Sequence, residues 1–246
     1  IVTRFENNLS EVGIKLLPKA VADSSPDAAD RFRQEARVMA RIDHPNIVKV
    51  YDIGKTFRGD FYFTMEFVHG YDLHELIQGG KLEPQHVESW VPQICDALTY
   101  AEGLGVAHCD IKPGNILIDR HGKVKVADFG ISNRADQSGS YRPSGFIGTP
   151  PYGAPELPHS GDHRSDIYSL GAVLYEMLTG KPIQHPWRPP SFASELIDPR
   201  YDEIVSRALE KNPADRYQSA AEFSTEVAHI AATPQSLRKP TRVMLP

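Results

Sequence analysis

The chain changes its periodicity at His69-Gly70, and this change limits the folds that are open to it. Before this point, residues 1–68 are typical of short strands, with one helix beginning near Ser24-Ser25-Pro26-Asp27. After it the pattern is mainly helical, with helices expected at 83–104, 166–178, 201–209 and from 219 onward. We therefore expect an α+β protein with a small β-rich lobe and a larger, mainly helical lobe.

Three further patterns belong to the helical part. The expected helix at 166–178 is apolar nearly all round, which predicts that it runs through the middle of its lobe. The last helix carries a Ser219-x-x-Glu222 capping box at its start. Residues 115–126 predict a strand hairpin, and residues 133–148, which have no periodicity, predict a surface loop.

Composition excludes several classes of protein. With 246 residues, 40% hydrophobic and 24% charged, the chain is typical of a globular protein. The net charge of −5, without a dense basic run, gives no reason to expect nucleic acid as a partner. No apolar run approaches the roughly 18 residues that cross a bilayer, so we expect no membrane insertion within this chain.

Two cysteines, Cys95 and Cys109, are too few for a disulfide framework, which indicates a reducing compartment and makes the cytoplasm the expected location. Tethering to a membrane through segments outside the chain stays open. The chain begins at Ile1 without an initiator methionine, so we expect further protein before it, and fused upstream or downstream domains stay open too.

Two short segments carry the chemistry. The first is His108-Cys-Asp-Ile-Lys-Pro-Gly-Asn115, and the second is Asp128-Phe-Gly130, which follows the hairpin. Transfer of a phosphoryl group needs metal ions on the phosphates, a cation beside them and a carboxylate for the hydroxyl proton. Asn115 and Asp128 offer the hard oxygen ligands that Mg²⁺ prefers, which leaves Asp110 as the candidate base.

At these residues the chain resembles the protein kinase superfamily, and most closely its bacterial, eukaryotic-type serine/threonine branch. The resemblance implies that Asp110 is the catalytic base and that Lys112 lies near the transferred phosphate. It also implies that Asn115 and Asp128 hold Mg²⁺ (or Mn²⁺), with ATP as the co-substrate. Lys112, two residues after the base, resembles serine/threonine kinases more than tyrosine kinases.

The resemblance extends to the small lobe. Lys15 matches the strand lysine that binds the α- and β-phosphates, and Glu35 matches its ion-pair partner on the helix. The hinge would be 65–68, and it would contact adenine. The resemblance implies that the adenine ring lies between Gly13 above it and Leu117 below it. Met65 would lie behind the ring, and the backbone of Glu66 and Val68 would meet its edge.

Further along, Gly148-Thr-Pro-Pro-Tyr-Gly-Ala-Pro-Glu156 resembles the segment that shapes the platform for a peptide substrate. The resemblance implies that Asp166 holds the backbone of the catalytic loop and that Arg216 pairs with Glu156. Thr149 would bond near Asp110 and Lys112.

The chain departs from the family pattern in three places. No G-x-G-x-x-G precedes Lys15, so the first strand and the glycine-rich loop of the small lobe are missing from this chain. Cys109 stands where most family members have arginine, so we expect activity not to depend on phosphorylation of the loop 133–148. Between Gly180 and Tyr201 there are few residues, mostly Pro-rich, so a helix common in the family should be absent.

The domain boundaries follow from these matches: a kinase domain at 1–246, with a partial N-lobe and hinge at 1–68, a C-lobe at 69–232 and a tail or linker at 233–246. The favoured function is transfer of the ATP γ-phosphoryl group to serine or threonine hydroxyls of protein substrates. The alternative is a pseudokinase that acts as a binding or scaffold module, because the glycine-rich loop is absent. A kinase of small molecules is disfavoured by the segment 148–156, which is typical of peptide substrates.

Overall fold

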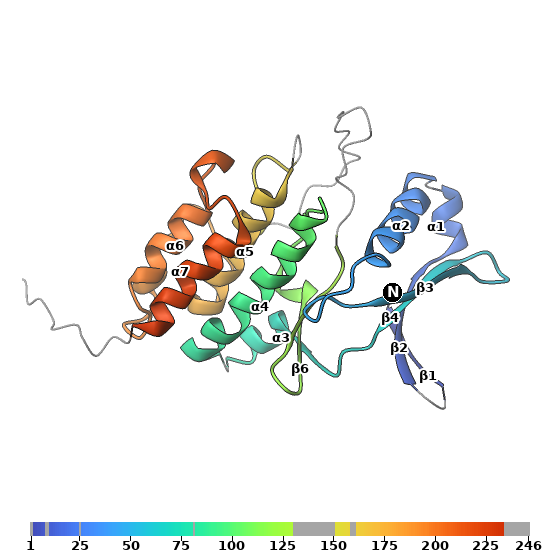
Figure 1. Ribbon diagram of the computed structural model, residues 1–246, viewed down its shortest axis with the longest axis horizontal. Coiled ribbons are helices and arrows are strands. Elements are labelled where there is room, and N and C mark those ends of the chain that lie inside the picture. The colour runs from blue at the N-terminus through green and yellow to red at the C-terminus, as the bar shows by residue number, and fades with distance from the viewer. Residues whose placement is uncertain are drawn as a thin grey trace, which may run out of the picture.

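The computed structural model has two lobes, and it describes residues 2–7, 10–24, 26–80, 82–129, 151–157 and 161–233. Figure 1 shows the strands and two helices of the N-lobe on one side and the helices of the C-lobe on the other. The expected α+β architecture is thus confirmed.

The N-lobe is an antiparallel sheet with strand order β1-β2-β4-β3, covered by two helices. Its elements are, in chain order, β1 (Val2–Asn7), β2 (Ser10–Leu17), α1 (Lys19–Ser24), α2 (Pro26–Met39), β3 (Val50–Lys55) and β4 (Phe61–Glu66). The short helix α1 was not expected, because the start signal at Ser24 to Asp27 marks only α2. Strand β1 lies at an edge of the sheet.

The C-lobe is built from helices and one small sheet of order β5-β6-β7. Its longer elements are β5 (Gly70–Asp72), α3 (Leu73–Gln78), α4 (Pro84–Gly103), β6 (Ile116–Asp119), β7 (Val124–Val126), α5 (His163–Thr179), α6 (Arg200–Ala208) and α7 (Ala220–Ala232). Short 3-10 turns lie at Pro113–Asn115, Pro190–Phe192 and Pro213–Asp215. Helix α3 was not expected. It is six residues long, too short to be stable alone, and it depends on its Asp72 capping box and on the burial of Leu73 and Ile77.

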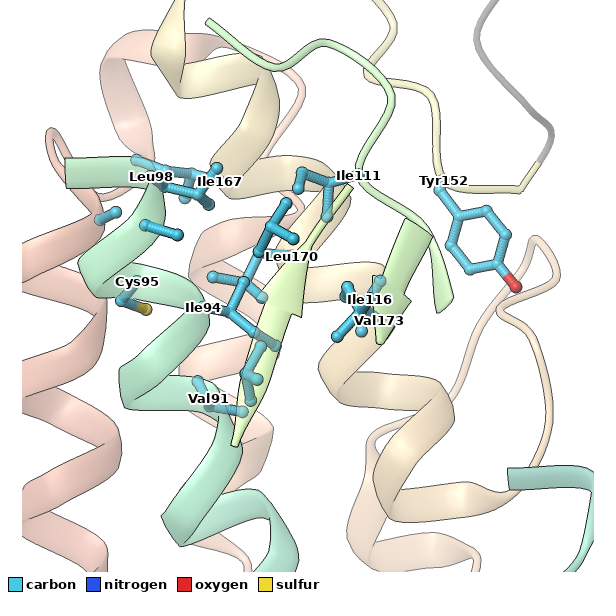
Figure 2. Close-up of a cluster of buried hydrophobic side chains, with 14 of the residues drawn as sticks. Val91, Ile94, Cys95, Leu98, Ile111, Ile116, Tyr152, Ile167, Leu170 and Val173 are labelled. Atoms are coloured by element: carbon cyan, nitrogen blue, oxygen red, sulfur yellow. The ribbon is translucent and has the colours of Figure 1, made fainter. Parts of the chain in front are cut away.

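Helix α5 is the axis of the C-lobe, as its apolar sequence predicted. Every residue from Ser165 to Leu174 is buried, and Gly180 closes the helix in a left-handed conformation, with φ of 72°. Figure 2 shows Ile167 and Leu170 of α5 beside Ile94 and Leu98 of α4, with Ile111 near the strands of the hairpin. This core fixes the loop that precedes β6.

Two smaller expectations are decided here. Between the end of α5 and the start of α6 the described chain forms only a 3-10 turn, so the expected absence of a helix there is confirmed. The capping box of α7 is half right: the Ser219 hydroxyl accepts from the Glu222 amide at 3.1 Å, but the Glu222 carboxylate accepts from the Gln218 amide. The loop 133–148 and the tail beyond Thr233 lie outside the described residues.

Candidate active site

Asp166, near the start of α5, holds the backbone of the loop that contains Asp110. The two carboxylate oxygens of Asp166 accept the backbone N–H groups of His108 at 2.7 Å and Cys109 at 2.6 Å. Cys109 has a φ of 62°, in the left-handed region that side chains disfavour, so these bonds hold the loop in a conformation it would not adopt alone. The predicted role of Asp166 is confirmed. Burial raises the pKa of Asp166 to about 7, against the effect of the two amide donors.

Asp110, Lys112 and Asn115 form one connected group. The Lys112 ammonium lies 2.7 Å from the Asp110 carboxylate. The Asn115 amide nitrogen donates to the Asp110 carboxylate at 3.0 Å and to the Asp110 carbonyl at 2.8 Å. Because the amide nitrogen of Asn115 is directed at Asp110, its amide oxygen is the atom that could ligate a metal.

His108 connects this loop to the segment around Asp128. Its Nε2 lies 3.0 Å from the Ala127 carbonyl oxygen, its Nδ1 accepts the Asp110 amide at 3.2 Å, and its ring lies 4.4 Å from that of Phe129. Burial lowers the pKa of His108 to about 4, so the ring is neutral at physiological pH. Reasoning from the sequence gave His108 no role of its own.

Asp128 and Lys15 meet between the lobes. The Lys15 ammonium lies 2.9 Å from the Asp128 carboxylate, and Asp128 has a left-handed φ of 54°, a second strained position in the site. The side chain of Glu35 lies outside the described residues, so its pairing with Lys15 stays a prediction. Helix α2 nevertheless approaches the sheet, because Phe32, one turn before Glu35, packs on Phe63 at 5.2 Å.

The donors present fit a magnesium ion. Asn115 and Asp128 supply hard amide and carboxylate oxygens. Within the described segments no three His, Cys, Asp or Glu side chains are grouped as a metal cage. Mg²⁺ suits such a site, since it usually takes one or two protein ligands and completes its shell with water and phosphate oxygens.

The hinge forms the back of the site. Gly13 on β2 pairs with Met65 on β4, and a Cβ at Gly13 would lie 3.2 Å from the Met65 side chain. Glycine therefore suits Gly13 because Met65 fills the adjoining space. The Glu66 amide donates to the Lys49 carbonyl at 2.8 Å, so adenine could meet Glu66 only through its carbonyl. Leu117 and Val68 pack against the core while staying partly exposed.

One contact at the hinge was not expected from the sequence. The carboxylate of Glu66 bonds to the ammonium of Lys125 on β7 at 2.7 Å, which joins the end of the N-lobe sheet to the C-lobe. The two residues are 59 positions apart, and no local pattern marks either one.

The segment from Pro151 to Leu157 is anchored on α5. Arg216, 1% exposed, binds both carboxylate oxygens of Glu156, at 2.7 and 2.8 Å, which confirms the predicted pair. Burial and hydrogen bonding to the Glu176 carboxylate raise the pKa of Tyr152, whose hydroxyl donates to Glu176 at 2.5 Å. Sequence reasoning missed this second pair. Thr149 lies outside the described residues.

A model of the protein kinase domain family matches residues 3–230. The chain belongs to this family. It is 39% identical over 241 residues to the serine/threonine-protein kinase PknB of Mycobacterium leprae, covering 89% of this chain and 39% of that protein. It is 38% identical over 242 residues to PknB of Mycobacterium tuberculosis, covering 89% and 38%. With the probable PknB of Bifidobacterium longum it shares 36% over 243 residues, covering 88% and 35%.

The kinase domain thus spans about two fifths of the length of these curated relatives. The resemblance drawn from the motifs is confirmed at the level of the family. None of the helices in the part of the kinase domain that the structure describes is long and apolar enough to span a bilayer.

Proposed function

We propose that this kinase domain transfers the γ-phosphoryl group of ATP to serine or threonine hydroxyls of proteins, with Mg²⁺ (or Mn²⁺). The observation that carries the proposal is the connected group of Asp110, Lys112 and Asn115 beside a strained Asp128 paired with Lys15. The two parts are joined by the Ala127 amide, one residue before Asp128, which donates to the Asn115 carbonyl at 2.9 Å. The names of the curated relatives support the choice of serine and threonine. A non-catalytic scaffold would not need these polar groups to be connected.

In this proposal Asp110 orients the substrate hydroxyl and receives its proton, since its carboxylate is positioned by both Lys112 and Asn115. Lys112 offsets negative charge near the transferred group, and Lys15 binds the α- and β-phosphates. Asn115 and Asp128 would hold Mg²⁺, which neutralises charge on the phosphates when it is bound.

The adenine ring would lie between Gly13 and Leu117, with Met65 behind it and the backbone of Glu66 and Val68 at its edge. We also propose 1–246 as the domain, with lobes 1–68 and 69–232, and the tail 233–246 as a linker. The chain has only two cysteines, both buried and too few for a disulfide framework, which supports a cytoplasmic location.

The test is phosphoryl transfer from radiolabelled ATP to casein. Asp110→Asn and Asp128→Asn are each expected to lower the rate by about 10²-fold or more, because both act in the chemical step. Asp96→Asn, an exposed position on α4, should keep the rate of the unchanged protein. Unaltered rates in the first two variants, with the fold intact by circular dichroism, would contradict the assigned roles.

A further inference from the structure

The C-lobe carries a groove of about 540 Å³ that contains none of the proposed active-site residues. Its walls come from the start of α4, the end of α5, the segment before α6, α6 itself and the end of α7. These helices pack against one another in the C-lobe (Figure 1). The volume falls within the range of small-molecule sites, about 300–1,000 Å³.

One of the residues that line the groove carries a buried polar group without a hydrogen-bond partner. Tyr201, on α6, is 3% exposed, and its hydroxyl has no hydrogen-bond partner within the described part of the chain. The pKa of Tyr201 is raised to about 12 by burial, with contributions from Glu88 and Asp198, which both line the groove. Tyr201 is itself one of the residues that line the groove. A buried hydroxyl left unpaired is costly, so it is a site at which a ligand can gain a hydrogen bond.

The charges around the groove are mainly negative. Glu83 and Glu88 are exposed at the start of α4, and Asp198 is the third carboxylate of the lining. Among the described residues of the lining, Arg200 is the one basic side chain; it binds Asp198 at 2.7 Å and donates to the Thr233 carbonyl at 2.8 Å, beyond the end of α7. The positive charge of Arg200 is therefore offset by the Asp198 carboxylate and the Thr233 carbonyl.

Apart from Ser194, the rest of the lining is apolar. Val87 and Ile197 are buried in the walls, and Leu196 is 81% exposed beside them. A ligand that fits must therefore combine an apolar body, which would cover these side chains, with a positive group for the carboxylates.

We propose that the groove binds an organic ammonium compound, whose apolar body lies between α4 and α6 and whose N–H group donates to the Tyr201 hydroxyl. The ammonium lies near Glu88 in this arrangement, and the aromatic or aliphatic body covers Leu196. The binding does not depend on the phosphotransfer reaction, and it is measured without nucleotide.

The test uses isotope-labelled protein and NMR titration with three probes of one carbon skeleton: 3-phenylpropylammonium, 3-phenylpropanol and 3-phenylpropanoate. At low salt the ammonium compound should bind at least about tenfold more tightly than the carboxylate, with the alcohol between them, because the rim is acidic. The shifted signals should belong to groove residues such as Val87 and Ile230.

Two tyrosine variants separate the hydroxyl from the rest of the fold. Tyr201→Phe should weaken binding of the ammonium probe about fivefold or more. Tyr217→Phe, a buried tyrosine outside the groove, should leave it unchanged. Glu88→Gln should weaken it about threefold, since one carboxylate of the rim is lost.

A melting experiment without probe provides the second readout. Because the Tyr201 hydroxyl is unpaired in the free protein, Tyr201→Phe should leave Tm unchanged or raise it. A lower Tm would show that the hydroxyl is already satisfied by water, and this would overturn the proposal. Equal binding of the carboxylate probe, or undiminished binding to Tyr201→Phe, would overturn it as well.

Discussion

Among single residues, His108 shows how one side chain can join two functional segments. It accepts the Asp110 amide at Nδ1, so the proton of the neutral ring is on Nε2, directed at the Ala127 carbonyl. Protonation of Nδ1 would place two donors against each other and would put a charge into a buried site. The candidate base and the segment before Asp128 are therefore held together by a neutral histidine.

This histidine predicts a pH dependence of stability. The pKa of His108 is about 4 in the folded chain and about 6.5 when unfolded, so the unfolded chain binds more protons between these values. The contribution of His108 is present above pH 6.5 and is lost as pH falls toward 4, by up to about 3 kcal/mol. The advantage of the unchanged protein over His108→Gln in urea unfolding should shrink across this window.

Asp166 acts in the opposite direction, since its pKa is raised to about 7 in the folded chain and its contribution falls as pH rises from about 4 to 7. Asp166 is present in both the unchanged protein and His108→Gln, so its contribution cancels in the difference between their free energies of unfolding. His121→Gln, in the exposed turn of the hairpin, is the control. A difference that stays constant from pH 4.5 to 7 would show that His108 is not held neutral by the fold.

Among the elements, α5 decides the packing of the C-lobe through its smallest residue. A Cβ at Gly171 would lie 2.6 Å from the Cβ of Ala208, at the end of α6. The close approach of α5 and α6 therefore depends on glycine at 171, although glycine weakens a helix interior by roughly 0.5–1 kcal/mol relative to alanine.

Gly171→Ala should accordingly destabilise the protein, by about 1–3 kcal/mol, because the gain in helix propensity is smaller than the cost of overpacking. Gly103→Ala, at the end of α4, is the matched control. A Cβ there meets no atom within 4 Å, so the change should be neutral or stabilising by up to about 1 kcal/mol. Urea unfolding of both variants checks this, and equal effects would mean that the two helices can separate without cost.

For the whole molecule, the relation between the lobes depends on a few contacts around the hinge. Glu66 binds Lys125 at 2.7 Å, and Lys15 binds Asp128 at 2.9 Å. The chain before β3 also pairs with β7, since the Val48 amide donates to the Val126 carbonyl at 2.9 Å. Strand β1 forms an edge of this sheet, so an added opening strand of the kind in the family pattern could pair with its outer side.

A version of the chain extended by such a strand with a G-x-G-x-x-G loop should bind a non-hydrolysable ATP analogue with Mg²⁺ more tightly. We expect a gain of about tenfold or more, because backbone N–H groups would then donate to the phosphates. Calorimetric titration of both forms measures it, and an extended form with the three glycines changed to alanine is the control. Equal affinities would show that the added loop does not contribute.

The sequence by itself determined the residues that lie close along the chain. Asp110, Lys112 and Asn115 fall within six positions, so their spacing alone brings them into one loop. The buried axis at α5 and the hairpin at β6 and β7 follow from hydrophobic periodicity, which reports how a segment is buried. The bonds of Asp166 to the loop backbone and the ion pair of Arg216 with Glu156 were also predicted, but only through resemblance to a family.

Only the tertiary structure decided the remaining contacts. Lys15 and Asp128 are 113 positions apart, and the pairing of Tyr152 with Glu176 and the unpaired hydroxyl of Tyr201 have no local pattern at all. The short helices α1 and α3 were missed for a related reason, since six residues are too few to form a stable helix without packing. Periodicity records which face of a segment is buried, whereas the partner that it meets depends on how the two lobes close around the core.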